Sequence, residues 1–157
     1  MRSSPAKWIG TLAFYVTIPA LYFYLQRDER TRVVVIHGND VLVLKGWYGS
    51  NKWMLPGGGI HKGEEPLIAA LRELKEETSV VLEPDQLKYH GKDVINENYG
   101  LKYTYHMYSV RLGEKPVVKH QRLEICDSKW VPVQQVINDK KGTLRSTRQI
   151  VQVWSNT

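Results

Sequence analysis

The chain has 157 residues and a formal net charge of +6, and 42% of its residues are hydrophobic. This length and an ordinary globular composition predict one domain with a real core, carrying at most a short appendage. The single cysteine, Cys126, excludes an intrachain disulfide framework and fits a reducing compartment, and no Cys and His cluster indicates zinc. The basic balance suits phosphate-rich partners or an anionic membrane.

Residues 1–30 differ from the rest of the chain, because no charged residue interrupts the apolar run from Trp8 to Leu25. As a helix, this run would measure about 27 Å, close to the roughly 30 Å hydrocarbon core of a bilayer. We therefore expect residues 8–25 to form a membrane-anchoring helix that tethers a cytosolic domain, residues 31–157. A surface-lying or self-associating apolar helix and a helix packed on the domain are the alternatives. No small-x-small cleavage site follows the run, which disfavours a signal peptide.

The first part of the domain reads as a β-hairpin. Val33–Ile36 and Val41–Leu44 are runs of β-branched and aliphatic residues, and His37–Asp40 between them has the composition of a turn. Strands that are apolar almost without a break predict a sheet covered on both faces. A loop then leads through Trp53 into three successive glycines, Gly57–Gly59.

The segment after these glycines predicts a helix with an unusual charge pattern. Pro66 suits its first turn, and at about 100° per residue three carboxylates share one narrow stripe, Glu73, Glu76 and Glu77. Leucines and, more loosely, an isoleucine fall on the opposite, inner stripe, namely Leu67, Leu71, Leu74 and Ile68. Like charges at this spacing repel each other, whereas a hard cation would stabilise them. A glycine-rich loop beside such a stripe predicts a site for metal and phosphate, and a solvated acidic face is the alternative.

The rest of the chain continues as strands followed by a helix. The expected strands are Leu87–Ile95 and Leu101–Leu112, and Val80–Leu82 is expected to begin another strand. A terminal helix at Thr143–Trp154 has an inner stripe of Leu144, Ile150, Val151 and Trp154. This order predicts an α/β fold with a mixed sheet between helices.

The glycine loop and the acidic helix resemble the Nudix box, G-x5-E-x7-R-E-U-x-E-E-x-G-U, where U is a bulky aliphatic residue. The residues in register are Gly58, Glu64, Arg72, Glu73, Leu74, Glu76, Glu77 and Val80. Ser79 departs from the pattern, which has glycine there, just past the helix end where a left-handed conformation is common. The resemblance implies a Nudix-type α/β/α sandwich, here with the N-terminal apolar helix added.

The resemblance also implies a function, the metal-dependent hydrolysis of a pyrophosphate bond in a nucleoside diphosphate linked to another group. Mg²⁺ or Mn²⁺ is then held by Gly58, Glu73, Glu76 and Glu77, while Arg72 keeps a glutamate in position. The general base is Glu76 or a residue from a later loop, for which Glu124 is the candidate. We expect Gly57, Gly59 and Trp53 to bind the substrate.

Three alternatives remain open at this stage: a non-nucleotide diphosphate as substrate, an RNA 5′ end as substrate, and a nucleotide-binding protein without activity. The expected partners are a nucleotide-type small molecule and, through residues 8–25, a membrane. We expect no DNA partner, and the sequence does not predict an oligomeric state.

Overall fold

A computed structural model describes residues 29–46, 51–97, 102–119 and 125–156 of the chain. Within these ranges lie six strands, namely β1 (Glu29–His37), β2 (Asp40–Gly46), β3 (Trp53–Met54), β4 (Lys88–Asn96), β5 (Lys102–Arg111) and β6 (Ile125–Pro132). The same ranges contain three α-helices, namely α2 (Pro66–Thr78), α3 (Val133–Asn138) and α4 (Arg145–Ser155), and a 3₁₀ turn at Pro84–Gln86. The predicted hairpin, box helix and terminal helix are therefore present.

The strands form one mixed sheet in the order β3-β2-β1-β5-β4, with β6 also paired to β2. β1 and β5 run parallel, from Glu29 opposite Thr104 to Ile36 opposite Arg111, and the other pairs are antiparallel. β1 thus lies between β5, which pairs with it from Glu29 to Ile36, and β2, which pairs only with its last residues, Ile36 and His37. A mixed sheet is what the sequence predicted.

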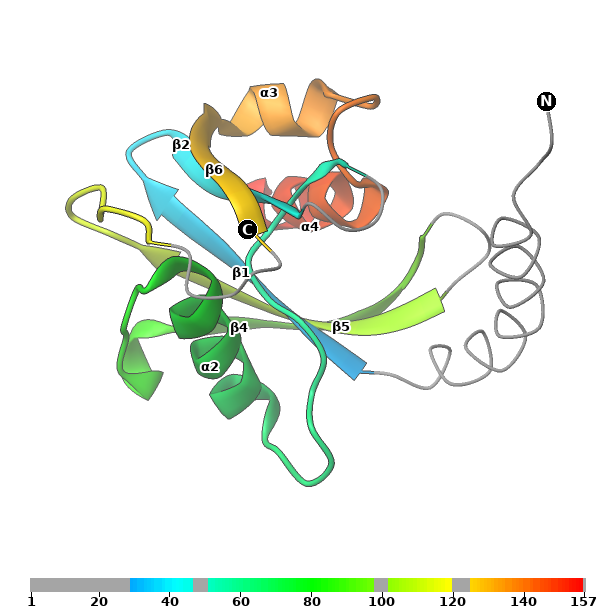
Figure 1. Ribbon diagram of the computed structural model, residues 1–157. Helices are drawn as coiled ribbons and strands as arrows, with labels where there is room; N and C mark the ends of the chain where they lie inside the picture. The colour runs from blue at the N-terminus through cyan, green and yellow to red at the C-terminus, as the bar shows by residue number, and fades with distance from the viewer. Residues whose placement is uncertain (1–28, 47–50, 98–101, 120–124, 157) are drawn as a thin grey trace, which may run out of the picture.

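Helices cover both faces of this sheet, α2 on one side and α3 with α4 on the other (Figure 1). Side chains alternate along β1, so Val33 and Val35 pack in the cluster with α2, while Val34 and Ile36 pack in the cluster with α3 and α4. All four are at most 1% exposed. The predicted α/β/α sandwich is confirmed, and the apolar runs reflect burial on both faces.

The predicted membrane helix, residues 8–25, lies outside the described residues and stays a prediction. Within the ranges that the structure describes, no helix is long and apolar enough to cross a bilayer. The proposed boundary between residues 1–30 and the domain likewise stays a prediction.

The buried face of α2 differs from the one expected. Glu73 and Glu77 are only 4% and 5% exposed and lie on the same side as the buried Ala69 and Ala70, whereas Ile68 is 50% exposed. The prediction of a carboxylate stripe opposite the buried face was therefore wrong, as was the inner position of Ile68. Helical spacing orders the residues around the axis, but the two small alanines and the glycine loop decide which side lies against the domain.

The predicted strand at Val80–Leu82 is also absent, since these residues are irregular. The Val80 amide donates to Thr78 Oγ1 at 3.2 Å and so completes the end of α2. Val80 is buried, whereas Val81 is 66% exposed. The apolar character of Val80 thus serves the contact between α2 and the sheet.

Ser79 ends α2 in the left-handed region, at φ 63° and ψ 9°, as predicted for the glycine position of the box. Its amide donates to Lys75 O at 2.8 Å, and its hydroxyl donates to Lys119 O at 2.7 Å. A left-handed conformation costs an L-residue about 1–2 kcal/mol. The hydroxyl bond offsets part of this cost and ties the helix end to the segment after β5.

We expect Ser79→Ala to lower the free energy of unfolding by about 1 kcal/mol, because it keeps the left-handed backbone and loses the bond to Lys119. Ser79→Gly should stay within about 0.5 kcal/mol of the wild type, since relief of backbone strain offsets the same loss. Urea denaturation of the three proteins measures both values. Equal stability of the alanine and glycine variants would contradict this account of the cap.

Candidate active site

The glycine loop is held in place by the first half of β1. The Thr31 amide donates to Gly58 O and the Val33 amide to Pro56 O, both at 2.9 Å, and the Ile60 amide donates to Glu29 O at 3.1 Å. The loop therefore runs antiparallel to β1 like a short extra strand. This pairing brings the three glycines against the middle of α2.

Gly57 is required by the close approach of backbone, and Gly58 lies directly against a carboxylate. Gly57 has a φ of 129°, and a Cβ there would collide with the Thr31 carbonyl. A Cβ on Gly58 would lie 2.7 Å from the Glu73 carboxylate. Gly59, by contrast, has nothing within 4 Å of the corresponding position. The loop thus touches the carboxylates at Gly57 and Gly58 and faces open space at Gly59.

The Arg72 guanidinium lies among the box carboxylates. Its Nε and Nη2 donate to the two Glu64 oxygens at 2.7 and 2.9 Å, and Nη2 also donates to Gly59 O at 3.1 Å. Its Nη1 donates to Glu73 Oε1 at 2.7 Å and to Glu76 Oε2 at 3.4 Å. Arg72 therefore makes the contact to a glutamate that the sequence predicted. It also gives Glu64 a partner, which the sequence had not decided.

These bonds govern protonation at the site. The hydrogen bond from Arg72, with smaller contributions from the His61 amide and nearby charge, lowers the pKa of Glu64 to about 2, against the opposing effect of burial. The bond to Glu64 and then that to Glu73 raise the pKa of Arg72, again against burial. Both partners stay ionised across the physiological range.

The remaining carboxylates have different surroundings. The Glu77 Oε2 accepts a hydrogen bond from the Gly57 amide at 2.8 Å, and both Glu73 and Glu77 are buried. The Glu76 side chain is 32% exposed. The structure thus brings together all the predicted loop and helix residues, namely Gly57, Gly58, Gly59, Arg72, Glu73, Glu76 and Glu77.

The donor set consists of carboxylate and carbonyl oxygens, which are the ligands that Mg²⁺ and similar hard cations prefer. The Gly58 carbonyl uses one lone pair for the Thr31 amide and retains a second. In the described part of the chain, no three His, Cys, Asp or Glu side chains already converge as metal ligands. Arg72 Nη1 lies between Glu73 and Glu76, so these two carboxylates would have to turn toward a cation.

The other predicted site residues are less closely linked to the loop. Trp53 lies in β3, packs against the buried cluster with α3 and α4, and has Lys129 Nζ 4.1 Å from its ring centroid. Its backbone pairs with Gly142 and Leu144. A substrate contact for Trp53 stays a prediction. Glu124 lies outside the described residues, so its role as general base also stays a prediction.

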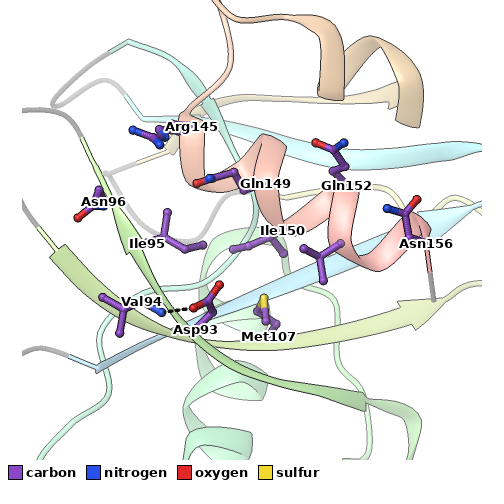
Figure 2. A pocket seen from close by; sticks show the side chains of 11 residues that line it. Asp93, Val94, Ile95, Asn96, Met107, Arg145, Gln149, Ile150, Gln152 and Asn156 are labelled. Carbon is purple, nitrogen blue, oxygen red and sulfur yellow. Dashed lines mark hydrogen bonds between the residues drawn. The ribbon is translucent and has the colours of Figure 1, made fainter.

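A pocket of about 340 Å³ lies on the opposite face of the sheet, between β4, β5 and α4 (Figure 2). Ile95, Met107 and Ile150 supply apolar lining, and polar side chains surround them, namely Asp93, Asn96, Arg145, Gln149, Gln152 and Asn156. Sequence reasoning missed this pocket, because its walls come from segments some fifty residues apart. The one available signal was the spacing of three polar residues, Arg145, Gln149 and Gln152, which places them on one face of α4.

Comparison with known proteins agrees with this fold and site. Residues 26–152 match the family described as the NUDIX domain. The chain therefore belongs to the Nudix family of pyrophosphohydrolases.

Individual relatives and structural neighbours share less than a third of their residues with this chain. An RNA pyrophosphohydrolase of Acinetobacter baylyi is 28% identical over 139 residues, covering 72% of this chain and 80% of the relative. An Ap4A hydrolase of C. elegans has a similar fold, with a TM-score of 0.67 and 21% identity, covering 82% of this chain and 96% of that one. The NUDIX domain of Shewanella oneidensis NrtR, solved with ADP ribose, gives a TM-score of 0.68 at 19% identity, covering 81% and 85%.

The depressed pKa of Glu64 predicts a specific acid sensitivity. A carboxyl whose folded pKa is about 2 stabilises the fold fully above its ordinary value of 4.5, and this contribution is lost as the pH falls from 4.5 to 2. Between pH 6 and pH 3 the wild type should therefore lose about 1–2 kcal/mol more stability than Glu64→Gln. Urea unfolding of both proteins at the two pH values measures this difference. Parallel losses in the two proteins would show that the Glu64–Arg72 pair does not stabilise the fold in this way.

Proposed function

We propose that the protein hydrolyses a pyrophosphate bond in a nucleoside diphosphate linked to another group, with Mg²⁺ or Mn²⁺ as cofactor. The observation that carries this proposal is that hydrogen bonds from Arg72 and the Gly57 amide hold Glu73, Glu76 and Glu77 beside the glycine loop. A diphosphate is strongly anionic, so attack by water requires neutralisation of its charge.

The residues that would hold the cation are Glu73, Glu76, Glu77 and the Gly58 carbonyl. The chemistry that such a cation supplies is charge neutralisation and a lowered pKa of water bound to it. Arg72 Nη1 donates to Glu73 Oε1, and the Gly57 amide donates to Glu77 Oε2. Each carboxylate is therefore held by a donor on one side.

Glu76 is the first candidate for the general base. Its side chain is the most exposed of the three carboxylates, and its contact with Arg72 is the longest that this guanidinium makes, at 3.4 Å. One Glu76 oxygen would accept the proton of the attacking water. Glu124, on a later segment, is the second candidate.

The pocket beneath α4 is a candidate for the organic end of the substrate. Gly59 pairs with Arg30 on β1, Arg30 with Tyr105 on β5, and Tyr105 with Asp93, which lines the pocket. Measured within the sheet, three strand spacings separate the loop from Asp93, about 14 Å, and the pocket lies on the opposite face. The amide side chains of Asn96, Gln149 and Gln152 offer both donors and acceptors to a nucleobase.

An RNA 5′ end is the second candidate substrate, because the Acinetobacter baylyi relative is an RNA pyrophosphohydrolase. Such an end carries the same anhydride, and the junction of loop and helix would contact only the diphosphate of either substrate. Two further alternatives are hydrolysis of a non-nucleotide diphosphate at the same site and nucleotide binding at this site without hydrolysis.

Glu77→Gln should lower turnover by at least about a hundredfold while leaving the fold intact, since it removes one charged ligand and keeps the side-chain volume. The measurement is kcat with saturating substrate and Mg²⁺, accompanied by circular dichroism. Glu114→Gln, on an exposed loop, removes the same charge elsewhere and should behave like the wild type. A folded Glu77→Gln variant with wild-type turnover would show that the metal assignment is wrong.

A screen of diphosphate compounds with Mg²⁺ should yield a nucleotide-type substrate. The panel contains nucleoside triphosphates, nucleotide sugars, ADP-ribose, dinucleoside polyphosphates and a short 5′-triphosphorylated RNA, read out by phosphate or pyrophosphate release. Cleavage of the RNA at much higher kcat/KM than the mononucleotides would favour the second candidate. Cleavage of only a lipid or inositol diphosphate would overturn the nucleotide assignment.

A further inference from the structure

Arg32 carries a buried charge directly behind the glycine loop. It lies on β1, is only 5% exposed, and its Nη1 donates to the carbonyls of Gly57 and, at 3.1 Å, Thr31. Its guanidinium carbon lies 5.3 Å from the ring centroid of Tyr105, within the range of a cation–π contact. Burying a guanidinium to this degree costs free energy, which its hydrogen bonds to the two carbonyls and its contact with the Tyr105 ring partly offset.

Gly57 links Arg32 to a carboxylate of the candidate active site. Its carbonyl accepts from Arg32, and its amide donates to Glu77 Oε2 at 2.8 Å. Gly57 has a φ of 129°, and glycine can adopt many other backbone conformations at little cost. The amide and the carbonyl belong to the two peptide groups that flank the Gly57 Cα, so the bonds to Glu77 and from Arg32 fix one group each and together restrict rotation at Gly57.

The Arg32 side chain is itself supported from behind. The Tyr105 hydroxyl donates to Glu97 Oε1 at 2.9 Å. Burial, more than the neighbouring charges, raises the pKa of Tyr105 to about 12, so this phenol stays protonated and remains a donor. Glu97, Tyr105, Arg32, Gly57 and Glu77 thus form one continuous series of contacts from β4–β5 to α2.

We propose that Arg32 is a positioning residue for the metal ligand Glu77, acting through the backbone of Gly57. The inference rests on the proposed metal role of Glu77. By holding the Gly57 carbonyl, Arg32 helps to keep the Gly57 amide directed at Glu77 Oε2, and so helps to fix the orientation of this carboxylate. Groups that orient metal ligands in this way typically change metal affinity about 10–100-fold when they are removed.

Arg30 provides a matched control two residues earlier on the same face of β1. Its guanidinium carbon lies 4.1 Å from the centroid of the Tyr103 ring, so it makes the same kind of ring contact. Within the described ranges, however, its side chain makes no hydrogen bond to the glycine loop. Replacing Arg30 removes a charge and a ring contact from β1 while leaving the Gly57 carbonyl with its donor.

The test is direct Mn²⁺ binding without substrate, measured by electron paramagnetic resonance of free Mn²⁺. Arg32→Met should weaken binding about 10–100-fold. Arg30→Met should stay within about twofold of the wild type. Arg32→Lys should lie between them, because lysine keeps the charge and a donor but loses the planar fork. Amide hydrogen exchange by NMR should show faster exchange at Gly57 in Arg32→Met alone.

Wild-type Mn²⁺ affinity and unchanged Gly57 exchange in a folded Arg32→Met protein would overturn the inference. Equal losses of affinity in Arg30→Met and Arg32→Met would overturn it too, because they would indicate general loosening of β1. Should Arg32→Met fail to fold, the pair Arg32→Lys and Arg30→Lys decides the question by the same two readouts. Absence of Mn²⁺ binding to the wild type would instead refute the proposed metal site, and Gly57 exchange would still test the contact with Arg32.

Discussion

The Arg72 guanidinium is the interaction on which the site depends, because it allows several carboxylates to lie close together. It donates to five oxygens, which belong to Glu64, Glu73, Glu76 and Gly59. Carboxylates three and four residues apart on a helix repel each other when no cation is near. Arg72 offsets this repulsion and at the same time fastens the glycine loop to α2. A diphosphate-cleaving site needs both, since the loop and the helix supply different oxygens.

The sheet contributes by fixing the loop from the other side. β1 is central, paired in parallel with β5, and its first half holds the loop through backbone bonds. Odd-numbered residues of β1 face α2 and even-numbered residues face α4, so Arg32 reaches the loop from the face opposite the carboxylates. The glycine loop is thus held between Arg32 and Arg72. Gly57 is needed for this, because a Cβ there would collide with the Thr31 backbone, and a Cβ at Gly58 would displace the Glu73 carboxylate.

Local patterns in the sequence predicted most of the fold, whereas long-range contacts were out of reach. The apolar runs at Val33–Ile36 and Val41–Leu44, and the spacing of the box, depend on residues close together in the chain and predicted the hairpin and α2. The burial of Glu73 and Glu77 was missed, because it depends on how closely the loop packs on the helix. Nothing in the sequence marked Arg32, whose partner Gly57 lies 25 residues away. The pocket beneath α4 was missed for the same reason.

The central claim is that the junction of the glycine loop and α2 is where the protein binds its divalent cation. Mn²⁺ broadens the NMR signals of nuclei near it, so substoichiometric Mn²⁺ added to ¹⁵N-labelled protein locates the site directly. The account predicts that backbone amides of residues 57–59 and 73–77 broaden first, while those of α4 stay sharp. Broadening centred on another part of the chain, or uniform weak broadening of all exposed amides, would contradict it.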